Sequence, residues 1–311
     1  MPPANLDPGL LALLTQMLES GVQPFHQGTP EAARSLLASL CALSGPGPEM
    51  ARVENTELRG KDGGRFRVRV LTPMGTVSGI IAYYHGGGWV CGSIDDYDTL
   101  GRTLAVRTGC AVVLVDYRLA PEHRFPVPVE DCWVALNWIL DNRAALGGAT
   151  LPVMVAGDSA GGNLAAVVAL KARDAGKKLA LQALIYPVTN FDPETASYRN
   201  PDNQLLLTAT DMLWFWDHYL PDSAARRHQD ASPLLAASLA GVAPAVVITA
   251  EHDVLRDEGE AYAGKLAAAG VSVALKRFGR QAHGFFTMVN ILPASGDGIG
   301  FLADAVRAAL G

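Results

Sequence analysis

The stretch Val153–Leu170 decides the fold. In it the apolar run Val153–Ala156 leads into Gly157-Asp158-Ser159-Ala160-Gly161-Gly162 and then into the apolar run Leu164–Leu170. The first run is typical of a strand buried on both faces, and the segment from Gly162 to Ala175 has a helical pattern. A serine between small residues fits a tight strand-to-helix turn, where the positive end of the helix favours developing negative charge. Ser159 is therefore the candidate nucleophile, with an ordinary glycine-rich turn as the alternative interpretation.

Outward from this turn, strand-like runs alternate with helical patterns. The expected strands are Ile80–Tyr84, Ala111–Val115, Leu181–Tyr186, Ala245–Ala250 and Val271–Lys276, and the expected helices are Tyr97–Thr108, Val129–Asn142, Glu258–Ala269 and Gly300–Leu310. Such alternation predicts an α/β fold with a mostly parallel central sheet flanked by helices. Two further runs, Arg52–Leu58 and Arg65–Leu71, predict an antiparallel hairpin that opens the sheet.

Two segments do not follow the alternation. Residues 1–50 carry helical patterns and end in glycines and prolines, and residues 190–230 or so are rich in aromatic side chains and interrupted by prolines. We expect these two segments to pack together as a helical cap over the carboxyl edge of the sheet. The catalytic core would then comprise residues 51–189 and 231–311.

A second glycine-rich motif, His85-Gly86-Gly87-Gly88-Trp89, follows the expected strand Ile80–Tyr84. Acyl transfer passes through a tetrahedral oxyanion that needs hydrogen-bond donors aimed at it in advance. The amides of Gly87 and Gly88, with that of Ala160, are the candidate donors. A dinucleotide-binding fingerprint is excluded, because Cys91 stands where its last glycine would be. Trp89 is assigned either to the substrate pocket or to the core.

The general base should follow the nucleophile in the chain, because α/β hydrolases place nucleophile, acid and histidine in that order. Four histidines follow Ser159, of which His218 and His228 lie in the predicted cap. His283 follows the last expected strand, in a loop that could bring its ring to Ser159. His252 is the rival base, and we expect it to be an exposed neighbour of the acid.

The candidate acid is Asp253, which lies just beyond the expected strand Ala245–Ala250, at the sheet edge where catalytic loops gather. Glu251 is the rival acid. For Asp257 and Glu258 we expect the common role of capping the next helix. Asp158, beside the nucleophile, is expected to form a local hydrogen bond in the turn or to help bind the histidine loop.

Composition excludes several classes of function. The 311 residues carry a net charge of −6, with 49% hydrophobic and 18% charged residues, and contain no basic run, so neither nucleic acid nor an anionic membrane surface is an expected partner. The four cysteines form no metal-binding or disulfide pattern, so we expect no metal site. The first 21 residues lack the basic start of a signal peptide, and no apolar run reaches the length of a membrane span, so we expect a cytoplasmic enzyme.

Together these motifs resemble those of the bacterial hormone-sensitive-lipase-like (GDSAGG, family IV) branch of the α/β hydrolases. The resemblance extends to Asp116–His123, Tyr186-Pro187, Asp253–Glu258 and His283-Gly284-Phe285. It implies a serine carboxylesterase that acts on short- to medium-chain acyl esters through Ser159, His283 and Asp253, with no cofactor. It also implies a small ester as the partner molecule and a homodimer formed through Val271–Lys276.

Other functions remain open on this scaffold, because function depends on the cap and the pocket. A deacetylase, an amidase or a lactonase would use the same residues. A ligand-binding relative without catalysis is disfavoured, because His283 is present. Trp89 and Trp214 are the candidate substrate-binding residues.

Overall fold

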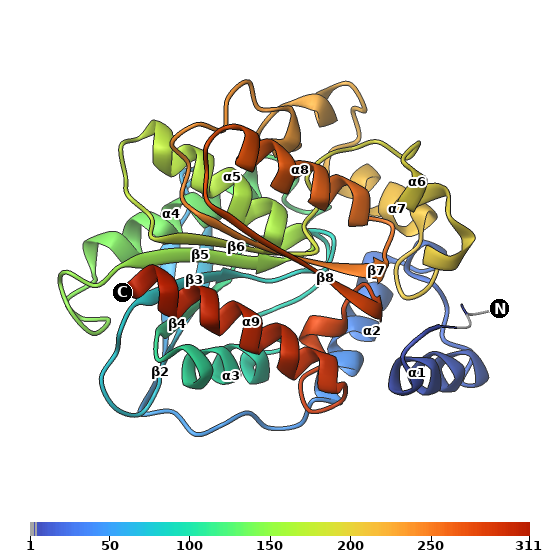
Figure 1. Ribbon diagram of the computed structural model, residues 1–311, viewed down its shortest axis with the longest axis horizontal. Helices are drawn as coiled ribbons and strands as arrows, with labels where there is room; N and C mark the ends of the chain where they lie inside the picture. The colour runs from blue at the N-terminus through green and yellow to red at the C-terminus, as the bar shows by residue number, and fades with distance from the viewer. Residues whose placement is uncertain (1–2, 4) are drawn as a thin grey trace.

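The computed structural model describes residue 3 and residues 5–311; residues 1, 2 and 4, with which the predicted cap begins, lie outside the described residues. Its centre is an eight-stranded sheet with the order β1-β2-β4-β3-β5-β6-β7-β8 (Figure 1). The strands are β1 (Arg52–Arg59), β2 (Arg65–Thr72), β3 (Ile80–Tyr84), β4 (Ala111–Asp116), β5 (Val153–Asp158), β6 (Leu181–Ile185), β7 (Ala245–His252) and β8 (Val273–Ala282).

The sheet is parallel from β4 through β8, while β1 and β2 form an antiparallel hairpin whose second strand pairs with β4. All residues of β3, β5 and β6 are buried, as expected for strands covered on both faces. The predicted α/β fold and the opening hairpin are thus confirmed.

Helices cover both faces of the sheet (Figure 1). On one face lie α3 (Asp98–Thr108) and α9 (Pro293–Leu310), and on the other lie α4 (Val127–Asp141), α5 (Ala160–Asp174) and α8 (Arg256–Ala268). Each face has its own apolar core, so the sheet is rigidly held between two packed layers.

Two element boundaries differ from the sequence expectation by more than two residues. Strand β8 continues beyond Lys276 to Ala282, because an edge strand can carry polar side chains on its exposed face and need not be apolar. Helix α9 begins at Pro293 instead of Gly300, although glycines are poor helix formers. A Cβ atom on Gly298 would lie 2.9 Å from the Phe286 ring, so tertiary packing accounts for one of these glycines.

The segments outside the alternation are helical. The first contains α1 (Pro8–Glu19), the short turn η1 (Phe25–Gln27) and α2 (Pro30–Ala42), and the second contains α6 (Ala196–Arg199), η2 (Pro201–Asn203) and α7 (Ala209–Tyr219). They contact each other, because the rings of Phe25 and Phe215 lie 5.4 Å apart and His26 Nδ1 lies 2.7 Å from Asp211 Oδ1. The division into cap and core stays a prediction.

Short turns of 3-10 helix complete the chain: η3 (Ala225–Arg227), η4 (Pro233–Leu235) and η5 (Phe285–Thr287). In the part of the chain that the structure describes, no helix is both long and apolar enough to cross a bilayer. Strand β8 is the last strand of the sheet order, and dimerisation through it stays a prediction.

Candidate active site

Ser159 lies on the tight turn between β5 and α5. Its backbone has φ 56° and ψ −120°, a strained conformation for a residue with a side chain. The turn tolerates only small neighbours: a Cβ atom on Gly161 would lie 1.9 Å from Tyr84 O, and one on Gly157 would lie 2.2 Å from Gly161 O. This geometry is the one that presents a nucleophilic hydroxyl at the end of a strand.

The structure brings Ser159, His283 and Asp253 together. His283 Nε2 lies 3.0 Å from Ser159 Oγ, and His283 Nδ1 lies 2.8 Å from Asp253 Oδ2. Asp253 is fully buried and His283 nearly so. With Nδ1–H donating to the carboxylate, the lone pair of Nε2 is free to accept the proton of the serine hydroxyl.

Asp253 is held by the turn that carries it and by the second helical segment. Its Oδ1 accepts a hydrogen bond from Leu255 N–H (2.9 Å), which leaves Oδ2 for the histidine. Asn203 Nδ2 donates to the Asp253 carbonyl (3.2 Å), and Ser197 Oγ donates to the Val254 carbonyl (2.6 Å). Such supporting hydrogen bonds fix the orientation of the acid before substrate arrives.

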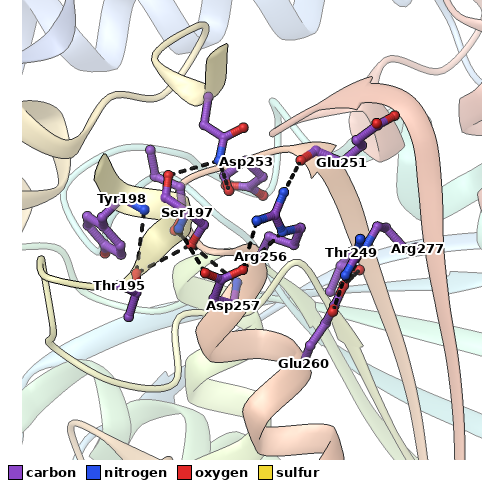
Figure 2. A network of polar contacts seen from close by, with 12 residues as sticks. Thr195, Ser197, Tyr198, Thr249, Glu251, Asp253, Arg256, Asp257, Glu260 and Arg277 are labelled. Atoms are coloured by element: carbon purple, nitrogen blue, oxygen red, sulfur yellow. Dashed lines mark hydrogen bonds and ion pairs between the residues drawn. The ribbon is translucent and has the colours of Figure 1, made fainter. Parts of the chain in front are cut away.

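Figure 2 shows how Arg256 and Asp257 extend this network. Arg256 donates to the Glu251 carbonyl (2.9 Å) and to Asp257 Oδ1, while Asp257 Oδ2 accepts from Ser197 N–H (2.8 Å). The turn after β7 is therefore tied to the α6 segment at several points.

Glu251 does not reach the histidine. Its carboxylate accepts hydrogen bonds from Arg280 N–H (2.6 Å) and Asn5 Nδ2 (3.2 Å). These bonds hold the pKa of Glu251 below its usual value. The expectation that His252 is exposed is wrong: it is the last residue of β7, and its side chain is buried.

The expected capping roles of Asp257 and Glu258 are also wrong. Helix α8 has Leu255 at its N-cap position and no side-chain cap. Glu258 instead accepts hydrogen bonds from the amides of Thr189 (2.6 Å) and Asn190 (3.1 Å). It thus anchors the chain just after β6, where Val188 N–H also donates to the Ser159 carbonyl.

Burial raises the pKa of Glu258 to about 8. The pKa of Glu258 is higher in the folded than in the unfolded protein. Its protonated side chain therefore contributes fully to the free energy of unfolding below the unfolded pKa, and this contribution is lost as the pH rises through about 8. We expect Glu258→Gln, which keeps an acceptor but cannot ionise, to gain about 2–3 kcal/mol relative to the native chain between pH 6 and pH 9. Urea unfolding of both proteins at the two pH values measures this difference. If the free energy of unfolding changed equally with pH in both proteins, this prediction would be contradicted.

The glycine loop, His85–Gly88, follows β3, and its residues Gly87 and Gly88 line the same cavity as Ser159. Gly87 and Gly88 have φ values of 106° and 59°, which favour glycine. A Cβ atom on Gly87 would lie 2.3 Å from Cys91 O, and one on Gly88 would lie 2.2 Å from the Phe215 ring. Ala160, the first residue of α5, has an amide with no partner inside the helix. All three amides are thus available as donors near the nucleophile.

A cavity of about 230 Å³ leads to Ser159 and His283. Most of its wall is apolar: α1 and α2 contribute Leu13, Met17, Leu36, Leu37 and Leu40 among others, and the second helical segment contributes Leu205, Leu206, Leu207 and Phe215. Among the described residues, no group of histidines, cysteines and carboxylates is arranged to hold a metal ion.

Neither Trp89 nor Trp214 is among the described residues that line this cavity. Trp89 is fully buried and stacks on Tyr219, with ring centroids 4.2 Å apart. Trp214 is half-buried and packs edge-on against Phe215. Phe215, from the aromatic-rich segment that was expected to close the pocket over Ser159, lines the cavity in place of the tryptophans.

Comparison with known proteins places this geometry in a family. The profile of a family described by the alpha/beta hydrolase fold matches residues 81–287. This chain is an α/β hydrolase of the hormone-sensitive-lipase-like branch. The hydrolase is 40% identical to the carboxylic ester hydrolase LipN of Mycobacterium tuberculosis, over 98% of this chain and 84% of that one.

Two further relatives extend the likeness. An ethyl acetate hydrolase of Pseudomonas putida is 35% identical, over 97% of this chain and 99% of that one. The solved structure of an esterase from Pyrobaculum calidifontis superimposes with a TM-score of 0.89 at 39% identity, covering 97% of this chain and 98% of the other. The hydrolase therefore shares sequence and fold with esterases along nearly its whole length.

Proposed function

We propose that the hydrolase is a serine carboxylesterase that cleaves short- to medium-chain acyl esters through an acyl-enzyme on Ser159. The observation that carries the proposal is the chain of contacts from Ser159 Oγ through His283 to Asp253 at the end of an apolar cavity. The esterase names of its relatives support the same reaction class.

Acylation begins when His283 Nε2 takes the proton of Ser159 as Oγ attacks the ester carbonyl. Negative charge then develops on the carbonyl oxygen, toward which the amides of Gly87, Gly88 and Ala160 would donate. Asp253 stabilises the imidazolium and keeps Nδ1 protonated.

The tetrahedral intermediate then breaks its bond to the alcohol oxygen. Protonated His283 donates its Nε2 proton to that oxygen, so the alcohol leaves as a neutral molecule. Water, activated by the same imidazole, attacks the acyl-enzyme and releases the carboxylic acid. Each cycle consumes one ester and one water and returns the proton to Ser159.

The composition of the cavity wall supports a neutral, apolar substrate. Among the described residues that line it there is no lysine or arginine, whereas leucines dominate. A carboxylate on the acyl group would lose its hydration without gaining a partner, so such esters should be poor substrates.

We expect kcat/KM to rise and then fall along a series of p-nitrophenyl esters from acetate to palmitate, with an optimum at about two to eight carbons. Each buried methylene contributes up to ~0.8 kcal/mol until the cavity is full. The series is measured with and without emulsified triglyceride, and matched amides and lactones are tested beside it. A long-chain optimum with interfacial activation would contradict the esterase assignment in favour of a lipase.

A cytoplasmic location is part of this proposal. The four cysteines, Cys41, Cys91, Cys110 and Cys132, are all unpaired thiols. Chains kept in a reducing compartment usually retain their thiols in this form.

A further inference from the structure

Asp158 precedes the nucleophile and its carboxylate is buried beside the glycine loop. Oδ1 accepts hydrogen bonds from the Tyr83 hydroxyl (2.9 Å) and from Gly86 N–H (3.0 Å), and Oδ2 accepts from the Tyr97 hydroxyl (3.0 Å). These three donors come from β3, from the glycine loop and from the chain just before α3. One carboxylate therefore joins the nucleophile turn to the glycine loop.

Tyr97 contacts both partners of this junction. Its hydroxyl donates to Asp158 and also accepts from Gly86 N–H at 3.1 Å. The fit is close: a Cβ atom on Gly86 would lie 2.4 Å from Asp158 Oδ2 and 3.0 Å from the Tyr97 hydroxyl. The position of Gly86, and with it that of the neighbouring Gly87, is set by this contact.

The ionisable groups close enough to interact with the charge of Asp158 are Tyr83, Tyr97, Tyr117, Tyr186, His283 and the thiol of Cys41. Burial raises the pKa of Asp158 to about 6, so the side chain is an anion at mildly alkaline pH. Burial also raises the pKa of Tyr83 and of Tyr97 well above the usual value, so both phenols keep their protons and act as donors. In this state a carboxylate with three donors forms strong, charge-assisted hydrogen bonds.

We propose that Asp158, together with Tyr97, is a positioning group that holds the glycine loop against the nucleophile turn, so that the amides of Gly87 and Gly88 face the oxyanion. The proposal rests on the esterase function. It adds a role for two residues that do not touch the reacting atoms. Holding donors in place before the reaction is the main source of oxyanion stabilisation, and a displacement of about 1 Å costs on the order of 10²-fold in rate.

Tyr97→Phe tests this role and Tyr84→Phe is its matched control. Tyr84 is also a buried tyrosine, but its hydroxyl donates to the Cys132 carbonyl on the opposite face of the sheet. Both variants lose one buried hydroxyl, and both are first shown to be folded by circular dichroism at the assay temperature. We expect Tyr97→Phe to lower kcat by about 10- to 100-fold with KM nearly unchanged, and Tyr84→Phe to keep kcat within about threefold.

Inhibitor binding separates positioning from a general loss of structure. A trifluoromethyl ketone adds to the nucleophile and forms an oxyanion, whereas the methyl ketone of the same length binds without doing so. We expect Tyr97→Phe to weaken the trifluoromethyl ketone by about tenfold or more and to leave the methyl ketone unchanged, since only the first needs aligned donors. Equal weakening of both ketones would overturn the proposal.

Substitution of Asp158 itself gives a second test. Asp158→Asn keeps an acceptor for Gly86 N–H, whereas Asp158→Leu has none, so we expect the asparagine variant to retain at least about tenfold more of the kcat than the leucine variant. If the native enzyme is active and the Tyr97 and Tyr84 variants have equal kcat, the positioning role alone is overturned. Native enzyme that cleaves no ester would instead overturn the proposed function.

Discussion

Replacing Ser159 with alanine should abolish covalent labelling by an organophosphate and lower kcat by roughly four or more orders of magnitude. Alanine keeps the backbone of the turn but removes the oxygen that lies 3.0 Å from His283 Nε2. Without it there is no atom to form the acyl-enzyme, and only the binding site and the loop amides remain to promote attack by water.

Ser295→Ala is the matched control for this variant. Ser295 is also buried and uses its hydroxyl to donate to the Phe286 carbonyl, at the start of α9 and outside the cavity wall. We expect full labelling and near-native kcat in that protein. Mass spectrometry of the labelled peptide identifies the modified residue. Labelling of the Ser159→Ala protein at full strength would show that the nucleophile is elsewhere.

Asp253→Asn should lower kcat by about 10⁴-fold, because an amide NH₂ facing Nδ1 favours the imidazole tautomer that carries its proton on Nε2. In that tautomer His283 cannot accept the proton of Ser159. The substitution keeps the shape of the side chain, so the cavity and the binding of substrate should change little. Steady-state kinetics on one p-nitrophenyl ester, with KM and kcat resolved, measures the effect.

Glu251→Gln serves as the control for the acid. Its carboxylate accepts hydrogen bonds from Arg280 and Asn5 and none from His283, so its loss should change kcat by less than about tenfold while lowering stability slightly. If the Glu251 variant lost its kcat while the Asp253 variant kept it, Glu251 and not Asp253 would be the catalytic acid.

The sheet and the nucleophile turn could be predicted because their signals are local. Continuous apolar runs indicate strands covered on both faces. The small residues around Ser159 indicate a turn at which β5 and α5 approach closely. The order of the motifs along the chain was enough to nominate His283 and Asp253, which the structure places in contact although 30 residues separate them.

The parts that could not be predicted depend on tertiary contacts. The role of Glu258 depends on two amides 68 and 69 residues away, so nothing near it in the sequence distinguishes it from a helix cap. The buried side of α7, which includes the cavity-lining Phe215, had in contrast a usable signal in the sequence. Met212, Phe215, Trp216 and Tyr219 form its buried stripe at helical spacing, and Trp214 lies off that stripe.

Much of the apolar wall of the cavity lies in a different part of the chain from the reacting groups. Most of the leucines that would surround an acyl group belong to α1 and α2, within the first 43 residues, whereas the glycine loop, Ser159 and His283 all come later. Natural selection can therefore alter substrate range by mutation in one terminal segment while the chemistry is inherited unchanged. A library randomised at Leu13, Met17 and Leu40, or chimaeras that exchange residues 1–50 among homologous esterases, would explore new substrates from a catalyst that already works.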